Sequence, residues 1–107
     1  MTFAVSPRIA ALRDVEETVD YYTREVGSQT ADRFVDGLAA AYDRLAHAPK
    51  AGSPLLGASL GLPELRTWPI PGFPYLVCYQ ARPGVIDVWR VLHAQRDLRQ
   101  AFSPSAH

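Results

Sequence analysis

Three residues near the C-terminus have side chains that could catalyse RNA cleavage. His93, Arg96 and Asp97 lie in the segment RVLHAQRD, which ends a run of alternating apolar residues. An imidazole that titrates near neutral pH can transfer protons, an aspartate can orient it, and a guanidinium can hold a phosphate. A single histidine at the end of a strand more often has a structural role. The segment alone therefore leaves both interpretations open.

The other polar candidates are dispersed or have a simpler explanation. Arg90 belongs to the same predicted strand as His93 but to its opposite face, and we favour a solvated edge position or an ion pair with an acidic helix residue over a functional role. His47 and His107 are too dispersed to form a metal site with His93, and the single cysteine, Cys78, excludes a multi-cysteine site. The glycine-rich segments lack the lysine of a phosphate-binding loop and do not lie between a predicted strand and a predicted helix, as such a loop does. The sequence therefore predicts no cofactor and no metal.

The charge distribution limits the possible partners. The chain of 107 residues has 11 basic and 11 acidic residues, so it lacks the global positive field that gathers nucleic acid. Residues 1–50 hold six bases and eight acids, a net charge of −2, whereas residues 51–107 hold five bases and three acids, a net charge of +2. All five bases of the second part are arginines, which are suited to forked hydrogen bonds and stacking. We therefore expect contacts in the C-terminal half.

No apolar run approaches the roughly 20 residues that are needed to span a bilayer, and no signal peptide opens the chain. Together with the single cysteine, this predicts a soluble protein of the reducing cytoplasm without membrane contacts.

Helical periodicity dominates the first half of the chain. After a short apolar stretch at residues 2–6, Ser6 and Pro7 are typical of a helix start. Apolar residues then recur at steps of three and four up to Gly27, which we expect to end the helix in the left-handed conformation. Ser28 can cap a second helix that ends before Pro49. Burial of the two apolar stripes predicts a core that contains Leu12, Val19, Phe34, Leu38 and Leu45.

Three β-strand candidates follow a loop at residues 49–64 that could hold one helical turn. They begin at Leu65, Tyr75 and Val85, and Pro69 demotes the first of them to an edge or bulged strand. The order is β-α-α-β-β-β, an α+β fold with a small antiparallel sheet. We expect the N-terminal strand to lie antiparallel beside this sheet, both helices to cover one face, and the other face to be free. Residues 1–102 should form one domain, and residues 103–107 a flexible tail.

The segments LPELRTWPIPGFPYLVCYQ and VIDVWRVLHAQRD together resemble the RelE/ParE superfamily of bacterial type II toxins, and ParE-type toxins in particular. The resemblance covers most of the chain, and its most specific motifs are FPYLV.Y at residues 73–79 and RVLH..RD at residues 90–97. It implies a RelE/ParE-like fold of the same β-α-α-β-β-β order. RelE-type members are ribosome-dependent endoribonucleases, whereas ParE-type members poison DNA gyrase without a nuclease site.

A few positions bear on the choice between these mechanisms. Where a RelE nuclease has an arginine on the middle strand this chain has Leu76, and where the nuclease has a C-terminal tyrosine it has Phe102. Leucine cannot bind a phosphate, and phenylalanine has no hydroxyl for proton transfer. Only Lys50 could correspond to the nuclease lysines. His93 and Arg96 match residues of related nucleases, but the motif that contains them is also common among ParE-like toxins.

The leading hypothesis is therefore a ParE-like toxin that inhibits gyrase by binding, with no catalytic residues of its own. Its target-binding surface is predicted to contain Arg66, Arg90, His93, Arg96 and Phe102. The alternative is a ribosome-dependent mRNA endoribonuclease, in which His93 is the general acid or base and Arg66 and Arg96 hold the phosphate. A third possibility is an interaction module that keeps the fold and the antitoxin contact without toxicity.

The resemblance also implies partners. A toxin of this class is neutralised by a cognate ParD-like antitoxin, which has a ribbon-helix-helix DNA-binding end and a disordered tail that folds on the toxin. Toxin and antitoxin would form a hetero-oligomer, and operator DNA would be bound only through the antitoxin.

Overall fold

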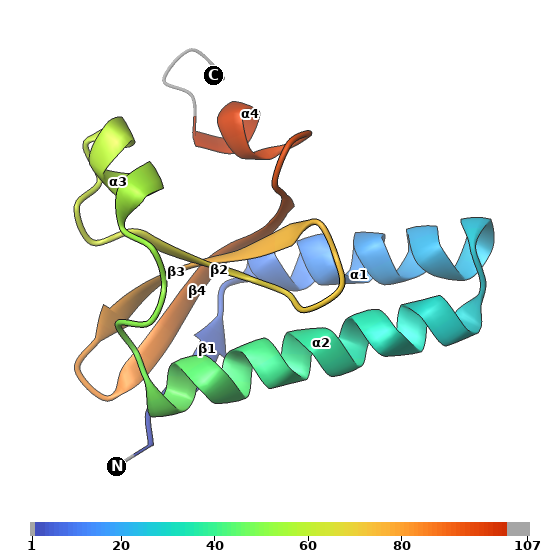
Figure 1. Cartoon of the computed structure of the whole chain (residues 1–107), viewed down its shortest axis with the longest axis horizontal. Helices are drawn as coiled ribbons and strands as arrows, with labels where there is room; N and C mark the ends of the chain where they lie inside the picture. Colours follow the sequence, from blue (N-terminus) through green and yellow to red (C-terminus); the bar gives the residue numbers. More distant parts are fainter. Residues whose placement is uncertain (1, 103–107) are drawn as a thin grey trace.

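The computed structural model describes residues 2–102, which form four strands and four helices (Figure 1). The strands are β1 (Ala4–Pro7), β2 (Arg66–Pro69), β3 (Tyr75–Arg82) and β4 (Val85–His93). The helices are α1 (Ile9–Glu25), α2 (Ser28–His47), α3 (Leu55–Leu60) and α4 (Leu98–Phe102). The α+β class and the order of the long elements are confirmed, and α4 is an addition that the sequence did not reveal. The predicted tail at residues 103–107 lies outside the described residues.

The sheet is mixed rather than antiparallel, because β1 is parallel to its neighbour. The strand order is β1-β4-β3-β2, and only the β1–β4 pair is parallel. The helical hairpin brings the chain back to the start of β1, where the Phe3 backbone N–H donates to the Ala46 carbonyl at 2.9 Å. The next strand, β2, therefore runs in the same direction as β1. The chain reverses between β2 and β3 and again between β3 and β4, so β4 is also parallel to β1. The predicted edge position of β2, argued from Pro69, is confirmed.

The first helix of the hairpin begins later than predicted, whereas the second begins one residue earlier, at the predicted cap. Ser6 and Pro7 pair with β4 as the end of β1, and α1 begins at Ile9. Proline is tolerated there because β1 is an edge strand. Gly27 has a φ of 140° and a ψ of 157°, an extended rather than left-handed helical conformation, and it precedes Ser28, the first residue of α2. The glycine allows this sharp reversal because no side chain opposes its positive φ.

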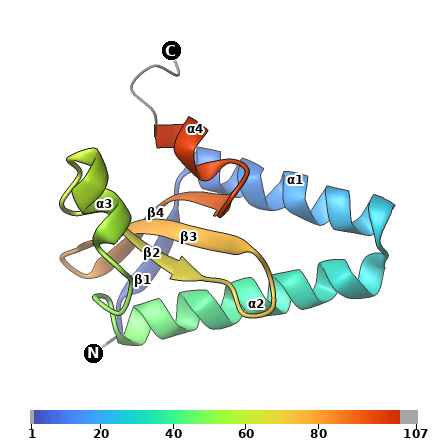
Figure 2. The ribbon, with the colours of Figure 1, turned by 45° about the horizontal axis from the view of Figure 1, so that its top comes forward.

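The main core lies between the helical hairpin and one face of the sheet (Figure 2). Phe34, Leu38 and Leu45 are buried as predicted, and Val19 is partly buried against them. Leu12 is 51% exposed, so its assignment to the core is wrong. The buried residue at this turn of α1 is Ala11, which lies about 100° away around the helix.

A β-bulge at Trp89 changes which face the end of β4 presents. Tyr79 pairs with Val88 and Cys78 pairs with Arg90, so Trp89 is the extra residue of the strand. The face that packs on the hairpin receives residues 86 and 88 before the bulge and Val91 after it. Strict alternation, which predicts one face for residues 85, 87, 89, 91 and 93, therefore holds only up to the bulge.

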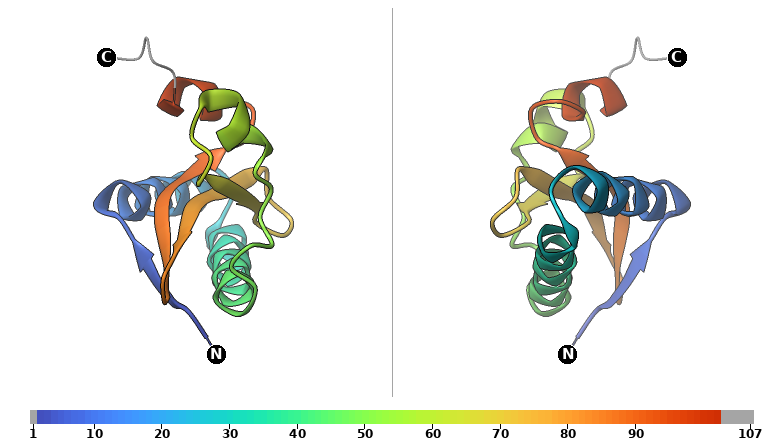
Figure 3. Two further views of the ribbon diagram at one scale, coloured as in Figure 1. Left: turned by 90° about the vertical axis from the view of Figure 1, so that its left-hand side faces the viewer. Right: turned by 90° about the vertical axis from the view of Figure 1, so that its right-hand side faces the viewer.

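The second face of the sheet is partly covered, which corrects the expectation that it is free. Figure 3 shows α3 and α4 next to each other at the end of the molecule opposite α2. Their apolar residues pack on a second cluster of buried side chains, Leu65, Cys78 and Leu92. The residues packed against this cluster are Leu56, Leu60, Leu62, Leu76, Trp89, Leu98, Ala101 and Phe102.

Candidate functional site

Arg90 and Asp14 join the open edge of β4 to α1. β1 pairs with β4 only as far as Val88, because the chain then turns into α1 through a hydrogen bond of 2.9 Å from the Arg8 backbone N–H to the Val88 carbonyl. Beyond this point the Asp14 carboxylate takes the place of a strand. Its Oδ2 accepts the Val91 backbone N–H at 3.0 Å, and its two oxygens accept the Arg90 guanidinium at 2.7 and 2.9 Å. Hydrogen bonding to Asp14 raises the pKa of Arg90 against the opposing effect of burial. This is the ion pair with a helix acid, one of the two structural roles that we favoured for Arg90.

His93 lies at the end of β4 and binds the turn that follows through one ring nitrogen. Its Nδ1 accepts the backbone N–H groups of Gln95 and Arg96, each at 3.2 Å. Because Nδ1 accepts these hydrogen bonds, the proton of the neutral ring resides on Nε2. The ring also packs edge-on against Tyr75, with 5.3 Å between the centroids. The imidazole therefore has a structural role in the turn whatever else it contacts.

Arg96 points back along the same turn and binds Asp97. Its Nε donates to Asp97 Oδ1 at 3.0 Å, and one terminal nitrogen donates to Asp97 Oδ2 at 3.2 Å and to the Tyr75 hydroxyl at 3.4 Å. These hydrogen bonds raise the pKa of Arg96, and the same contact lowers the pKa of Asp97. Arg96 is 60% exposed, so this charged pair remains accessible to a binding partner.

Phe102 and α4 cover the second face of the sheet next to this turn. The Phe102 ring is partly buried against the cluster of Leu65, Cys78 and Leu92. The Ala101 backbone N–H donates to the Asp97 carbonyl at 3.0 Å, so α4 continues directly from the turn. Phe102 therefore anchors α4 to the sheet.

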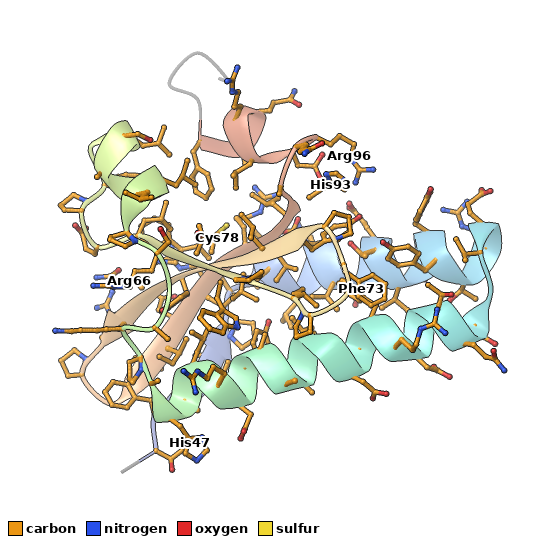
Figure 4. All side chains as sticks on the ribbon, viewed as in Figure 1. His47, Arg66, Phe73, Cys78, His93 and Arg96 are labelled. Carbon is orange, nitrogen blue, oxygen red and sulfur yellow. The ribbon has the colours of Figure 1, made fainter. Side chains whose placement is uncertain are left out.

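Arg66 lies at the other end of the strands. It is opposite Tyr79 on β3, whereas His93 is opposite Tyr75, and Figure 4 shows the two labelled side chains well apart. Its guanidinium donates to the backbone carbonyls of Lys50 at 3.2 Å and Gly52 at 2.8 Å. The structure thus brings Arg90, His93 and Arg96 to one end of β4 but leaves Arg66 apart from them.

Tyr79 binds the same loop as Arg66 and explains the glycine at position 52. The Tyr79 hydroxyl donates to the Pro49 carbonyl at 2.7 Å and accepts the Gly52 backbone N–H at 2.9 Å. A Cβ at Gly52 would lie 2.5 Å from that hydroxyl, so only glycine fits. Burial raises the pKa of Tyr79. Arg66 and Tyr79 together hold the connection from α2 to α3.

An open groove of about 1160 Å³ lies between α1, α3 and α4, with the end of β4 at its base. One side is mostly aliphatic, from α3 and α4, and the other carries the carboxylates of Asp14 and Glu17 from α1. The lining residues are Asp14, Glu17, Leu56, Ser59, Leu60, Arg90, Leu92, Arg96, Asp97, Leu98, Arg99, Gln100 and Ala101.

Sequence reasoning missed two carboxylates, Asp14 and Asp87, that form ion pairs at different points along β4. Asp14 lies on α1, and no spacing in the sequence links it to the edge of β4. The Asp87 carboxylate accepts hydrogen bonds from Nε and from one terminal nitrogen of Arg8, at 3.0 and 2.9 Å. The Arg8 guanidinium also lies over the Trp89 ring, 4.9 Å from its centroid. Hydrogen bonding to Arg8 lowers the pKa of Asp87. The buried Trp89 indole N–H has no hydrogen-bond partner among residues 2–102.

Residues 2–102 contain no group of three or more His, Cys, Asp or Glu side chains that could hold a metal ion. Among the helices of the same residues, none has the length and apolar character needed to cross a membrane.

Comparisons with known proteins identify the family. A family model described as the ParE toxin of the type II toxin–antitoxin system parDE matches residues 6–98. Among solved structures, a chain of the chromosomal ParDE toxin–antitoxin system from P. aeruginosa has a TM-score of 0.72 at 18% sequence identity, over 88% of this chain and 98% of that chain. This likeness supports the fold alone, and no curated protein matches the sequence. Because the family model covers most of its length, the chain belongs to the ParE toxin family of type II toxin–antitoxin systems.

Proposed function

We propose that this ParE-family toxin inhibits DNA gyrase by binding to it and that a cognate ParD-like antitoxin neutralises it. Family membership supports a toxin with an antitoxin partner. In this proposal the toxin supplies a surface rather than a reacting group, and operator DNA is contacted only through the antitoxin.

The observation that carries this proposal is that the polar side chains of the RVLH..RD motif are engaged within the protein. Arg90 is bound to Asp14, Arg96 is bound to Asp97, and Nδ1 of His93 accepts two backbone N–H groups. A nuclease needs a guanidinium that binds the scissile phosphate, whereas the guanidinium groups of Arg90 and Arg96 are each bound to a carboxylate of this chain. At the positions where a RelE nuclease has an arginine and a tyrosine, this chain has Leu76 and Phe102, whose side chains pack on the second cluster.

We propose that the gyrase contact lies at the end of β4 and on α4. Arg90, His93, Arg96 and Phe102 are gathered at this end, beside the groove between α1, α3 and α4. Arg66 would support this surface only indirectly, since it holds the connection from α2 to α3.

The proposal is tested by expression of the chain with and without a ParD-like antitoxin. Expression alone should arrest growth, and co-expression should restore it. The purified toxin should inhibit gyrase supercoiling and trap cleaved DNA, while translated messages stay intact. Normal supercoiling activity in the presence of excess toxin would overturn the gyrase proposal.

A ribosome-dependent endoribonuclease is the second candidate, favoured by the position of His93 and Arg96 within one turn beside an open groove. Primer extension on translated messages from the same cells separates the two. Cuts linked to codons, and lost in His93→Ala, would establish the nuclease in place of the gyrase inhibitor.

A further inference from the structure

The segment after β4 begins with a single helical turn, residues 94–97, whose backbone N–H groups are bound by His93, and the short helix α4 follows at Leu98. The Asp97 N–H donates to the His93 carbonyl at 3.1 Å, and the Ala101 N–H donates to the Asp97 carbonyl at 3.0 Å. Both are bonds between a residue and the fourth residue before it, as in an α-helix. The first N–H groups of such a segment have no partner within the helix and need an external acceptor.

His93 supplies that acceptor in the geometry of a helix N-cap. An N-cap side chain accepts from the backbone N–H groups two and three residues later, and Nδ1 of His93 accepts from Gln95 and Arg96, each at 3.2 Å. The contact is reciprocal, because Oδ2 of Asp97 accepts the His93 backbone N–H at 3.4 Å. This exchange resembles a capping box, with the acidic residue one position later than usual.

We propose that His93 is a positioning residue that acts through Nδ1: it caps the turn at residues 94–97 and thereby sets the place of Arg96 and of α4, which follows this turn, on the toxin surface. Two observations support this assignment. The Tyr75 ring fixes the plane of the imidazole, and the orientation of Arg96 toward Asp97 and Tyr75 depends on the turn that His93 closes. The cap itself is independent of the proposed gyrase target, whereas its effect on toxicity rests on the proposed function.

Asparagine and glutamine distinguish the two ring nitrogens. The Oδ1 atom of asparagine is attached to Cγ, as Nδ1 is in histidine, and asparagine is among the most favourable N-cap residues. The side-chain amide of glutamine extends to the position of Nε2 and leaves no acceptor at the Nδ1 position. His93→Asn therefore keeps the cap and removes the imidazole, whereas His93→Gln keeps a polar group at the far end of the ring and removes the cap.

The cap is tested by amide hydrogen exchange of the folded full chain, with NMR detection at Gln95, Arg96 and Ala101. His93→Ala and His93→Gln should each accelerate exchange at these amides by roughly 5- to 30-fold, the equilibrium factor for loss of a typical cap. His93→Asn should exchange like the natural chain. The control is His47→Ala, because Nδ1 of His47 contacts only the Asp43 carbonyl and carboxylate on α2. Unchanged exchange in His93→Ala, or protection in His93→Gln but not in His93→Asn, would overturn the proposal.

Growth arrest measured with the same variants links the cap to toxicity. His93→Asn should weaken growth arrest less than His93→Ala and His93→Gln do. The reverse ranking of Asn and Gln would show that His93 acts through Nε2 and would overturn the proposal. Absence of growth arrest in the natural chain would count against the proposed function, and the exchange experiment would still decide the cap.

Discussion

The sheet face that packs on α1 and α2 has a large aromatic core, whereas the face beneath α3 and α4 has a small aliphatic one. On the first face, Phe34 packs against Phe73 and Tyr75 with centroid distances of 5.4 and 5.5 Å. Helices of 17 and 20 residues cover it. On the second face, helices of six and five residues cover a cluster of three buried side chains.

This difference places most of the buried apolar contacts and the proposed contact surface in separate layers of the molecule. Helices of five or six residues are too short to be stable alone, so α3 and α4 depend on their contacts with the sheet. Regions with few buried apolar contacts open at low free energy, and binding surfaces are commonly built from such regions. The proposed contact surface therefore lies on the layer that can be altered without unfolding the protein.

The largest expected effect is loss of the aromatic core. Phe34 is fully buried, so Phe34→Ala should lower the free energy of unfolding by about 3 to 5 kcal/mol, as large-to-small changes at buried phenylalanines do. Urea unfolding followed by circular dichroism measures this change. The neighbouring Val35 is 45% exposed, and Val35→Ala should change the value by less than about 0.5 kcal/mol. Equal effects of the two substitutions would contradict the assignment of Phe34 to the main core.

The second effect concerns the edge of β4, where the two layers meet. Asp14→Ala removes the acceptor of the Val91 N–H and of Arg90 and should cost about 1 to 3 kcal/mol in the free energy of unfolding. Asp14→Asn keeps one acceptor oxygen and should cost less. Glu17→Ala, one turn later on α1, serves as the control. If Asp14→Ala is no worse than Glu17→Ala, the carboxylate does not replace a strand at this edge.

The layer that carries stability is also the one that the sequence predicts well. Apolar residues at steps of three and four identify Phe34, Leu38 and Leu45 as core because long helices average over many positions. Leu12 fails because α1 lies against α2 and β4 with a narrow buried face centred on Ala11. Periodicity alone cannot distinguish two neighbouring positions when the buried face is that narrow.

The candidate site is predictable only in part, because its contacts join distant positions. The Arg90–Asp14 pair spans 76 residues, and the parallel direction of β1 depends on where the hairpin returns the chain. The bulge at Trp89 leaves no pattern that a strict alternation could reveal. The motif predicts His93 at the end of the last strand, where the structure has it, but the contacts of its side chains depend on the turn rather than on residue type.

The third prediction tests whether the second layer can be altered alone. Phe102→Ala removes a partly buried ring and should lower the free energy of unfolding by only about 1 kcal/mol. Exchange of the Ala101 amide should accelerate, while amides of β3 change little. Leu55 is 76% exposed on α3, and Leu55→Ala should change neither quantity. Faster exchange throughout β3 after Phe102→Ala would show that the two layers unfold together.

The smallest expected effect is the pH dependence of the Asp97–Arg96 pair. Hydrogen bonds from Arg96 lower the pKa of Asp97 in the folded chain, against the opposing effect of burial. An unfolded aspartate titrates near pH 3.9. The stability that Asp97 contributes is thus fully present above about pH 4 and is lost as the pH falls through the lower pKa of the folded state. The difference in free energy of unfolding between the natural chain and Asp97→Asn should shrink over that interval.

A double-mutant cycle assigns this pH dependence to the pair. In the Arg96→Gln background the guanidinium that lowers the pKa of Asp97 is absent, so Asp97→Asn should have a smaller and flatter effect between pH 6 and pH 3. Urea unfolding at several pH values provides the four free energies of the cycle. If the pH dependence persists unchanged without Arg96, then the backbone N–H of His93, rather than the exposed ion pair, stabilises the charged carboxylate.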